Sequence, residues 1–255
     1  MQMHQHERHT FIVDLARRTP RVEVGDLAES LDVTPETIRR DLTALERHGL
    51  VRRVHGGAIA IERFGFEPTL ESRTELHREE KRRIAEMAIG LVPEHGVVLL
   101  DAGTTTGVIA ELLPHGRELT VVTDSLTIAG ALARRTDLEL HLLGGRVRHR
   151  TLAAVGPWAV HAIADVHVDV AFIGTNGVSV DRGLTTPDEA EAATKRAMIE
   201  ASACPVLVCD HSKIGTNHFH RFGELSSIDT IVTDSGLDPE TAAALGAHGP
   251  EVLLA

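Results

Sequence analysis

The sequence is poor in aromatic residues and in cysteine. Among 255 residues there is no tyrosine, one tryptophan and six phenylalanines. Proteins that bind single-stranded nucleic acid stack bases on aromatic side chains, so this scarcity argues against such a platform. The two cysteines, Cys204 and Cys209, lie five residues apart in a segment with the pattern of a buried strand. That spacing places them on opposite faces and predicts neither a disulfide bond nor a metal clip.

Long apolar runs and nucleotide-binding motifs are also missing. No segment approaches the roughly 20 apolar residues that a membrane span needs. The first dozen residues are polar and rich in histidine, unlike a signal peptide. Neither the Gly-x-Gly-x-x-Gly fingerprint nor the Gly-Lys-Ser/Thr of a Walker loop occurs. We therefore expect a cytoplasmic protein with no membrane partner and no cofactor, and these absences argue against a kinase-like or nucleotide-binding function.

Negative charge dominates the chain as a whole. The 37 acidic residues exceed the 26 basic ones and give a formal net charge of −11 at pH 7, which argues against a nucleic-acid partner. The charge is unevenly distributed, however, because residues 1–58 hold nine arginines and nine acidic residues. Within residues 38–55, five arginines accompany only two acidic residues. A locally positive element on an acidic body is therefore compatible with nucleic-acid binding.

Three short helical patterns occupy the N-terminal segment. Apolar residues recur at helical spacing in residues 7–18 and again in residues 22–33. A third helix should begin after Thr34, a residue type that caps helices, with Pro35 in the first helical position. Gly49 should end that helix. This order predicts a helix-turn-helix, and the alternating residues that follow Gly49 predict a small hairpin wing.

The arginines of the third helix and the wing admit two interpretations, an ordinary solvated face or a surface for a polyanion. The apolar stripe that begins at Ile38 would face the core and leave Arg39 and Arg40 exposed in the first two turns, where a recognition helix meets DNA. Arg52 and Arg53 of the wing could follow phosphates. We favour the second interpretation. The expected DNA-contacting residues are Thr34, Glu36, Thr37, Arg39, Arg40, Arg52, Arg53 and His55.

The chain is expected to divide into two domains. Residues 1–58 would form the DNA-binding domain, residues 59–76 lack strong periodicity and would form a linker, and residues 77–255 would form a second domain. That domain opens with a helical pattern whose basic run, residues 81–83, we expect to be solvated. Strand-like apolar runs then alternate with helical segments, which predicts an α/β domain with a largely parallel sheet. In such sheets, ligands bind beyond the carboxyl ends of the strands.

Residues 101–107, Asp-Ala-Gly-Thr-Thr-Thr-Gly, follow the first predicted strand of this domain. Gly103 allows a close turn, the threonines offer hydroxyls, and the next helix presents free N–H groups, a combination that binds phosphate. The alternative is a threonine-rich turn that only caps a helix. Ser125 should cap the following helix, while Lys195 and Lys213 are each either an anion partner or an ordinary surface lysine.

Sixteen histidines raise the question of metal binding. His211, His218 and His220 lie near Asp210, but their spacing matches no recognised ligand pattern. We expect surface or capping roles for these histidines and no metal site.

Residues 33–58, VTPETIRRDLTALERHGLVRRVHGGA, resemble the N-terminal signature of the DeoR family of bacterial transcriptional regulators. The resemblance covers essentially the whole chain, through DAGTTT, VVTDS, LLGG, DVAFIGTNGV, EAEAATKRAMI and CDHSKIG. It implies a C-terminal fold like that of ribose-5-phosphate isomerase, used in this family to sense a phosphorylated sugar or polyol. The implied effector-binding residues are Asp101, Gly103, Thr104, Thr105, Thr106, Ser125, Gly174, Asn176, Gly177, Glu189, Lys195, Asp210 and Lys213.

Two residues depart from the pattern of the family. Thr34 stands where the family most often has serine, and both residue types cap helices. Asp124 stands where the family commonly has asparagine. If its side chain faces the ligand, a carboxylate there would disfavour a nearby phosphate or demand an extra ligand hydroxyl.

The resemblance implies a transcriptional repressor of sugar or polyol metabolism genes, not an enzyme. It would act as a homodimer or homotetramer on double-stranded operator DNA and be released by a phosphorylated sugar metabolite. The alternative is an enzyme like a sugar-phosphate isomerase with an accessory DNA-binding arm, in which Asp101, Glu189 and Lys195 would transfer protons. Turnover assays with pentose and hexose phosphates separate the two, because a sensor binds these compounds without converting them.

Overall fold

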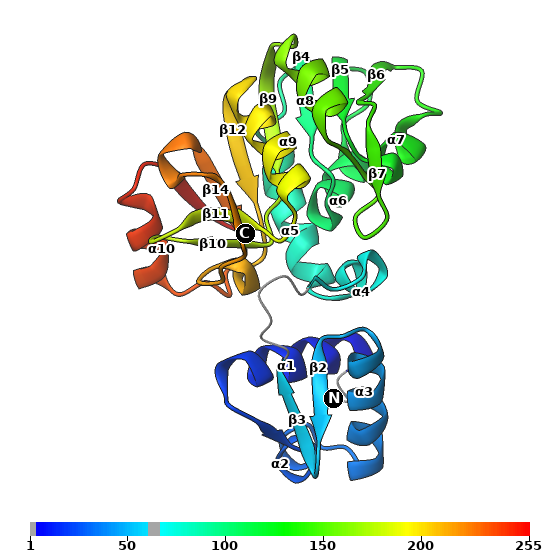
Figure 1. Cartoon of the computed structure of the whole chain (residues 1–255), viewed down its shortest axis with the longest axis vertical. Helices are drawn as coiled ribbons and strands as arrows, with labels where there is room; N and C mark the ends of the chain where they lie inside the picture. The colour runs from blue at the N-terminus through cyan, green and yellow to red at the C-terminus, as the bar shows by residue number, and fades with distance from the viewer. Residues whose placement is uncertain (1–3, 61–66) are drawn as a thin grey trace. The chain divides into compact units, whose positions relative to one another are not determined.

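The computed structural model describes residues 4–60 and 67–255. These residues belong to two compact units, Met1–Arg78 and Glu79–Ala255 (Figure 1). Each unit has its own hydrophobic core. Among the described helices, none is long and apolar enough to cross a membrane.

The first unit combines helices with a small antiparallel sheet. Its described helices are α1 (Gln5–Arg18), α2 (Val24–Ser30), α3 (Pro35–Arg47) and α4 (Leu70–Glu75). Its strands β1 (Val22–Glu23), β2 (Val51–Val54) and β3 (Gly57–Ala60) pair in the order β1-β3-β2. Ile12 of α1, Leu27 of α2 and Leu42 of α3 are fully buried in one cluster. The predicted helix-turn-helix and hairpin wing are therefore confirmed.

The segment expected to be a linker, residues 59–76, contains regular structure at both ends. The wing strand β3 continues to Ala60, and α4 occupies Leu70–Glu75. The hydroxyl of Thr69 caps α4 by accepting a hydrogen bond from the backbone N–H of Ser72 at 3.3 Å. Residues 61–66 lie outside the described residues.

The second unit is built on a seven-stranded parallel sheet in the order β15-β14-β12-β9-β4-β5-β6. This confirms the predicted parallel sheet. Its strands are β4 (His95–Leu100), β5 (Glu118–Thr123), β6 (Leu138–Leu142), β9 (Val168–Ile173), β12 (Ser202–Val208), β14 (Thr230–Thr233) and β15 (Glu251–Leu254). The chain runs outward from β4 through β5 to β6, then returns to the other side of β4 for β9. A topological switch point therefore lies between β4 and β9, where sheets of this kind bind ligands.

Helices cover both faces of the sheet (Figure 1). They are α5 (Arg78–Ile89), α6 (Thr104–Leu112), α7 (Leu126–Leu132), α8 (Pro157–Ala164), α9 (Glu189–Glu200) and α10 (Pro239–Gly246). One buried cluster joins alternate strand residues such as Val98 to Ile109 of α6, and the other joins Leu99 to Met198 of α9. Alternate residues of a strand point to opposite faces, so each central strand supplies both cores.

Two antiparallel elements were not anticipated from the sequence. Strands β10 (Gly177–Ser179), β11 (Gly183–Thr186) and β13 (His220–Gly223) form a three-stranded sheet, and β7 (Arg146–Arg148) pairs with β8 (Ala153–Val155). Strands of three or four residues carry too few alternations to give a recognisable period. Two short 3-10 turns, His211–Lys213 and Leu225–Ser227, complete the second unit.

The expectation that residues 81–83 form a solvated face is wrong for Lys81. This side chain is 4% exposed, whereas Arg82 and Arg83 are exposed. Lys81 precedes Ile84 and Ala85 by three and four residues, so the helical period places it on the apolar face of α5. The only tryptophan of the chain, Trp158, has the opposite character, because it is 77% exposed in the first turn of α8.

Candidate functional site

The N-terminus of α3 is built by a local capping arrangement. The hydroxyl of Thr34 accepts a hydrogen bond from the backbone N–H of Thr37 at 3.2 Å, and Pro35 occupies the first helical position. The hydroxyls of Thr34 and Thr37 lie 2.9 Å apart. Glu36 is in the first turn, where a negative charge favours the positive end of the helix dipole. The predicted helix start is confirmed.

The two arginines of α3 lie on its exposed surface. The side chain of Arg40 is 82% exposed and that of Arg39 is 54% exposed. Both reach toward Glu36, with nitrogen–oxygen distances of 3.3 Å from Arg39 and 3.9 Å from Arg40. Exposed ion pairs of this kind contribute little to stability, so a phosphate or a base edge can displace Glu36 from either guanidinium at small cost.

The wing is tied to α3 through Arg53. Its backbone N–H donates to Glu46 at 2.9 Å, and its guanidinium donates to the hydroxyl of Thr43 at 3.1 Å. Arg52 and His55 are exposed on the same hairpin. All eight residues predicted to contact DNA therefore lie on α3, its N-cap or the wing hairpin, and seven of them are exposed while Thr37 is half-buried. Their contact with DNA stays a prediction.

A buried carboxylate joins α3 to α1. Asp41 is 2% exposed and accepts hydrogen bonds from Arg8 at 2.8 Å and from His9 at 3.0 Å. Burial lowers the pKa of His9 below 6.5, although Asp41 opposes that shift. These contacts fix the orientation of the recognition helix on the body of the first unit.

The wing also depends on one close backbone approach. A Cβ atom on Gly57 would lie 2.0 Å from the carbonyl oxygen of Val22 in β1. Only glycine therefore permits β3 to pair with β1 at this point, in the register Val22–Ala58 and Glu23–Gly57.

In the second unit, the residues that follow β4 and β9 meet at the switch point of the sheet. Asp101 is 1% exposed, and its Oδ2 accepts a hydrogen bond from the backbone N–H of Gly174 at 2.8 Å. The same oxygen forms an ion pair with the ammonium group of Lys195 from α9. Lys195 also donates to the carbonyl oxygen of Gly174 at 3.0 Å. The structure thus brings together three of the residues predicted to bind the effector.

Lys195 is charged although it is buried. Burial by itself would lower the pKa of Lys195, but the carboxylates of Asp101 and Glu191 outweigh burial and raise it. The ammonium group also lies 5.7 Å from the centre of the Phe222 ring. A cation held in this way supplies a fixed positive charge at a buried position, where it acts strongly on a nearby anion.

The loop between β4 and α6 supplies backbone donors and hydroxyls. Gly103 is the N-cap residue of α6, and the first turn contains Thr104, Thr105 and Thr106. Thr106 donates to the carbonyl oxygen of Gly103 at 3.1 Å, while Thr105 and Thr106 are buried. On the neighbouring strand, Ser125 caps α7 by accepting from the N–H of Ile128 at 3.2 Å. The predicted cap is confirmed, and the N-termini of α6 and α7 open side by side at the carboxyl edge of β4 and β5.

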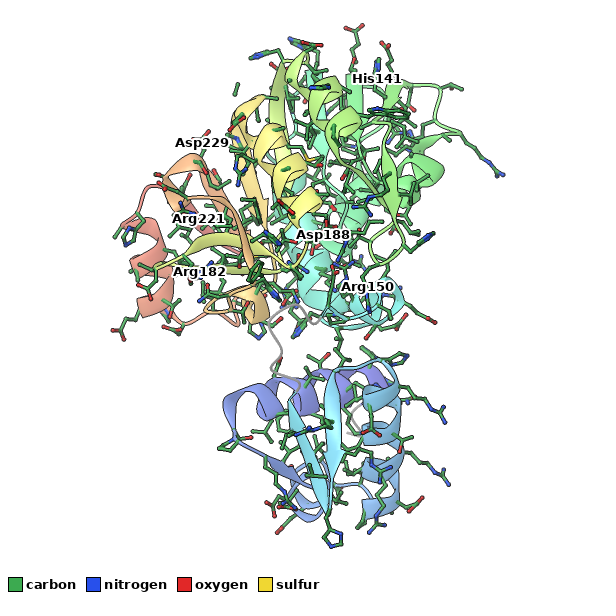
Figure 2. All side chains as sticks on the ribbon, in the orientation of Figure 1. His141, Arg150, Arg182, Asp188, Arg221 and Asp229 are labelled. Atoms are coloured by element: carbon green, nitrogen blue, oxygen red, sulfur yellow. The ribbon has the colours of Figure 1, made fainter. Side chains whose placement is uncertain are left out.

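A second polar group lies between α9 and the β7–β8 hairpin. Thr186 donates to Asn176 at 3.0 Å and to Glu191 at 3.1 Å. Arg148 of β7 reaches Glu191 at 3.4 Å and Asp188 at 3.1 Å. Asp188, labelled in Figure 2, caps α9 by accepting from the N–H of Glu191 at 3.0 Å. Burial would raise the pKa of Asp188, but this N–H and Arg148 outweigh it and lower the pKa.

Four predicted effector residues lie outside these contacts. Glu189 is exposed at the start of α9. Asp210 is buried beyond β12 and accepts from the backbone N–H of Ser212 at 3.1 Å, and Lys213 ends the same 3-10 turn. Gly177 starts β10, where a Cβ atom would lie 2.5 Å from the carbonyl oxygen of Thr216. The role of these four in ligand binding stays a prediction, as does that of the other nine residues of the predicted set.

Arg148, Thr186 and Glu191, which meet beside α9, were absent from the predicted set. The sequence held a signal for Glu191, because it precedes Lys195 by four residues and so shares its helical face. No local signal marks Arg148. It lies on the β7–β8 hairpin, 40 residues before its partner Asp188 at the start of α9.

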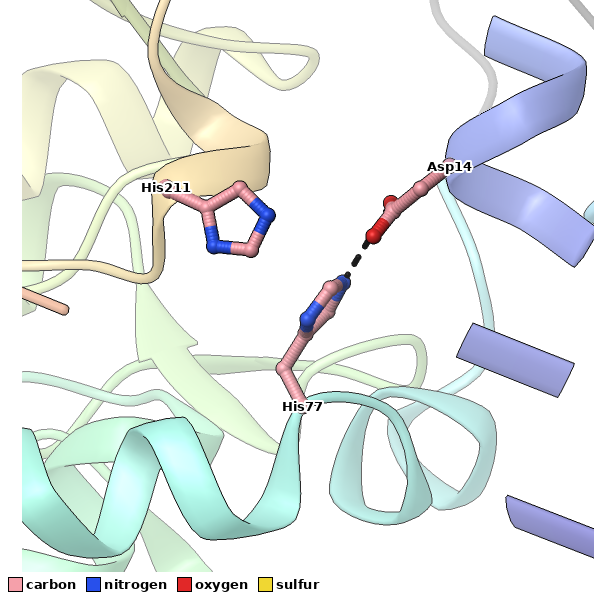
Figure 3. A group of neighbouring side chains, drawn as sticks. All are labelled: Asp14, His77 and His211. Carbon is pink, nitrogen blue, oxygen red and sulfur yellow. Dashed lines mark ion pairs between the residues drawn. The ribbon is translucent and has the colours of Figure 1, made fainter. Parts of the chain in front are cut away.

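The predicted surface or capping roles of the histidines are met in part. Nδ1 of His211 lies 2.8 Å from the carboxylate of Asp234. Burial would raise the pKa of Asp234, but the hydrogen bonds from His211 outweigh burial and lower it. His218 lies 3.2 Å from the carbonyl oxygen of Asn176. In the first unit, Nε2 of His77 lies 3.6 Å from Asp14 of α1 (Figure 3).

Comparison with known proteins adds an independent observation. Residues 8–64 match the DeoR-like helix-turn-helix domain, and residues 76–235 match the DeoR C terminal sensor domain. The chain is 39% identical over 247 residues to the HTH-type transcriptional regulator GlpR of Haloferax volcanii, covering 97% of this chain and 96% of that protein. It is 34% identical over 233 residues to the glycerol-3-phosphate regulon repressor of Escherichia coli K12, covering 91% and 92%.

Solved structures show a more distant likeness. Ribose 5-phosphate isomerase A from Methanocaldococcus jannaschii aligns over 54% of this chain and 55% of its own, at 18% identity and a TM-score of 0.40. The full-length sorbitol operon regulator SorC from Klebsiella pneumoniae aligns over 89% and 96%, at 13% identity and a TM-score of 0.39.

Proposed function

The chain belongs to the DeoR family of transcriptional regulators, and we propose that it is a repressor of sugar or polyol metabolism genes that leaves its operator when a phosphorylated metabolite binds. Relatives named as transcriptional repressors, among them a glycerol-3-phosphate regulon repressor, support this function. We propose residues 1–58 as the functional DNA-binding domain, 59–76 as the linker and 77–255 as the sensing domain. The protein acts in the cytoplasm as a homodimer or homotetramer.

The exposed N-terminal half of α3 is the main observation that supports DNA binding. Arg39 and Arg40 are exposed in its first two turns, and their single carboxylate neighbour, Glu36, is itself exposed and easily displaced. In a recognition helix these positions reach base edges and phosphates. Arg52, Arg53 and His55 extend the contact to the neighbouring backbone, and Thr34 and Thr37 add hydroxyl donors.

The effector site is the crevice at the carboxyl edge of β4, β5 and β9. The free N–H groups of the first turn of α6 and the hydroxyl of Thr104, which is only partly buried, hold the phosphate. Lys195 supplies the fixed positive charge beside it. Asp101, Ser125, Asn176 and Glu191 offer acceptors and donors to the hydroxyl groups of the carbon chain.

Binding is coupled to DNA release by differential affinity. An effector that binds the released state more tightly than the operator-bound state shifts the population toward release, by no more than that difference in affinity. The β7–β8 hairpin is the element through which occupation of the site could act, because its Arg148 pairs with Asp188 and Glu191 of the α9 region.

The protein is proposed to bind its effector without turning it over. Of the three groups that an isomerase would use for proton transfer, Asp101 and Lys195 form an ion pair with each other, and Glu189 is exposed at the start of α9, outside that pair. Their pairing supports a sensor, since a general base must be available to the substrate. Incubation with pentose and hexose phosphates should therefore return the starting compounds unchanged.

One experiment tests the proposal as a whole. Operator fragments selected from genomic DNA by the full-length protein are titrated in the presence of glycerol 3-phosphate, ribose 5-phosphate, glucose 6-phosphate, fructose 1-phosphate or inorganic phosphate. One phosphorylated carbon compound should raise the dissociation constant at least about tenfold and also raise the unfolding temperature. Failure to select any DNA would refute the regulator, and equal effects of all compounds and inorganic phosphate would refute the sensor.

A further inference from the structure

Asp124 is a buried carboxyl group held in place from three sides. It follows β5, is 2% exposed, and its Oδ1 accepts a hydrogen bond from the backbone N–H of Ala102 at 2.8 Å. Its own carbonyl oxygen accepts from the N–H of Ala154 in β8 at 2.8 Å, and Ser125 forms a bridge with Ala153. The hairpin therefore holds the backbone at Asp124 and Ser125 against the sheet, and the N–H of Ala102 holds the carboxyl group itself.

The charges around Asp124 come from every element packed against it. Asp101 follows β4, Glu191 and Lys195 are on α9, and Arg148 of β7 is paired with Glu191. If all were ionised, three carboxylates would share two cations in a crevice that is almost closed to water. One of these cations, Arg148, also serves Asp188, so the excess negative charge is greater still.

Asp101 and Asp124 compete for a single ammonium group. Asp101 receives two donors at one oxygen, the ammonium of Lys195 and the N–H of Gly174. Asp124 receives one backbone N–H, from Ala102. Two neighbouring carboxyls in such a site do not both ionise, and the one with fewer donors keeps the proton.

The pKa shifts point the same way. Burial, with the nearby charge of Asp101 second, raises the pKa of Asp124 well above 3.8. Burial raises the pKa of Asp101 as well, but Lys195 and the N–H of Gly174 oppose that rise. Of the two carboxyl groups, Asp124 is therefore the one whose surroundings favour the protonated form more.

We propose that Asp124 is a specificity-determining residue of the effector site, which it enters as an uncharged carboxylic acid whose O–H donates a hydrogen bond to an oxygen of the effector. This inference rests on the effector site proposed above. An ionised carboxylate at this position would repel a phosphorylated ligand, whereas the acid lets the anion approach and adds a donor. Effector affinity then falls as pH rises through the raised pKa of Asp124, and operator binding persists under alkaline conditions.

The protonation state can be measured without any ligand. In full-length protein labelled with ¹³C at the aspartate carboxyl carbons, one resonance should keep the chemical shift of a protonated acid at pH 7. That resonance should be absent from Asp124→Asn and present in Asp181→Asn, a change at an exposed aspartate of the same unit. A wild-type spectrum with every aspartate ionised at pH 7, or a resonance that survives in Asp124→Asn, would overturn the proposal.

The stability of the second unit gives a second ligand-free readout. Because the folded-state pKa of Asp124 lies above 3.8, the unfolded state releases this proton first, and wild-type stability should decline as pH rises from 3.8 toward the raised pKa. In Asp124→Asn that decline should be smaller, since the amide is neutral throughout and only the contribution of Asp101, whose pKa is also raised, remains. If Asp124→Asn and wild type show parallel pH profiles, the proposal fails.

The ligand contact is tested with ribose 5-phosphate, glycerol 3-phosphate and inorganic phosphate at pH 6, 7 and 8.5. For the compound that releases DNA, wild-type affinity should fall at least about threefold between pH 6 and 8.5, and Asp124→Asn should bind within about threefold of wild type at pH 7 with no such fall. Asp124→Ala, which removes the donor, should lose about tenfold or more. Equal pH dependence in wild type and Asp124→Asn overturns the contact. If no phosphorylated compound releases DNA, the proposed function fails and the contact with it, while the carboxyl resonance separately decides where the proton is.

Discussion

The ammonium group of Lys195 contacts the carboxylate of Asp101 across 94 residues of sequence, at the point where the order of the parallel strands reverses. Each partner is less than one-tenth exposed. A buried charge without its partner is strongly destabilising, whereas an uncharged pair of similar volume is tolerated. This ion pair is therefore a structural element of the second unit, at the place where we propose that the effector binds.

Removal of Lys195 alone should therefore destabilise the second unit. We expect Lys195→Met to cost about 3–5 kcal/mol in unfolding free energy, because Asp101 is left buried and uncompensated. The double variant Lys195→Met with Asp101→Asn should recover most of that loss. Denaturant unfolding of wild type, the two single variants and the double variant gives the coupling energy between the two positions. A coupling energy near zero would show that the ion pair does not contribute to the stability of the second unit.

Arg40 should contribute to operator affinity and little to stability. Arg40→Ala should weaken operator binding by about 1–3 kcal/mol if the guanidinium contacts a base edge. Arg82→Ala is the matched control, since Arg82 is an exposed arginine of α5 that pairs with Glu86 at 3.0 Å, as Arg40 pairs with Glu36. Both titrations are done at the same salt concentration, because phosphate contacts depend on it. Equal affinities of the two variants would remove Arg40 from the recognition surface.

Gly57 and Gly25 should respond in opposite ways to the same substitution. Gly57→Ala places a methyl group 2.0 Å from the carbonyl oxygen of Val22 and should destabilise the first unit by about 2 kcal/mol or more. Gly25→Ala has nothing within 4 Å, lies inside α2, and should be neutral or stabilise by about 0.5–1 kcal/mol. Thermal unfolding followed by circular dichroism distinguishes them, and a tolerated Gly57→Ala would mean that the β1–β3 pairing is dispensable.

Glu191 and Glu189 should differ in their effect on the effector response. Glu191 is buried and bonded to Thr186, with Arg148 at 3.4 Å, whereas Glu189 is exposed. Glu191→Gln should raise the effector concentration needed for DNA release about tenfold or more, and Glu189→Gln should leave it unchanged within about twofold. The measurement is half-maximal release of a labelled operator. The reverse order would return Glu189, the residue expected from the sequence, to the site.

His9 should make the first unit less stable in mild acid. Its pKa in the folded state lies below 6.5, so the unfolded state binds a proton at higher pH than the folded state does. The stabilisation from the neutral imidazole is complete above pH 6.5 and is lost as pH falls through 6.5 toward the folded-state pKa. Unfolding of His9→Gln should be less sensitive to pH between 5 and 8 than that of wild type. His161→Gln, at an exposed histidine of α8, should follow wild type; if it follows His9→Gln instead, the prediction is wrong.

The parts of the fold that were predictable depend on short-range chemistry. The cap at Thr34, the apolar stripe that begins at Ile38 and the cap at Ser125 are each set within four residues of sequence, and all are present. The parallel sheet was predictable for the same reason, because each strand–loop–helix unit shows a change in the spacing of its apolar residues. The exposure of Arg39 and Arg40 followed from the stripe, since the core leaves them only the exposed side.

The remainder depends on contacts that no local pattern encodes. The side chains around Asp124 come from β4, β7 and α9, and their mutual charges decide which carboxyl keeps a proton. Lys81 is another example. A run of three basic residues suggests a solvated face, but the helical period of α5 places the first of them, Lys81, on the buried side. Sequence identifies the chemistry at the edge of the sheet, but the distribution of charge there is a property of the assembled crevice.

Trp158 makes the second unit, and not the first, a source of tryptophan fluorescence. It is the only tryptophan, the chain has no tyrosine, and its exposed indole stands three residues beyond β8, the strand that packs over Ala102 and donates to the backbone of Asp124. Fluorescence excited at the red edge of aromatic absorption therefore originates in the sensing unit alone. The first unit contains no tryptophan and does not emit at that excitation wavelength. A change of emission on adding a metabolite therefore reports on the second unit, which carries the β7–β8 hairpin, even when the first unit is bound to DNA.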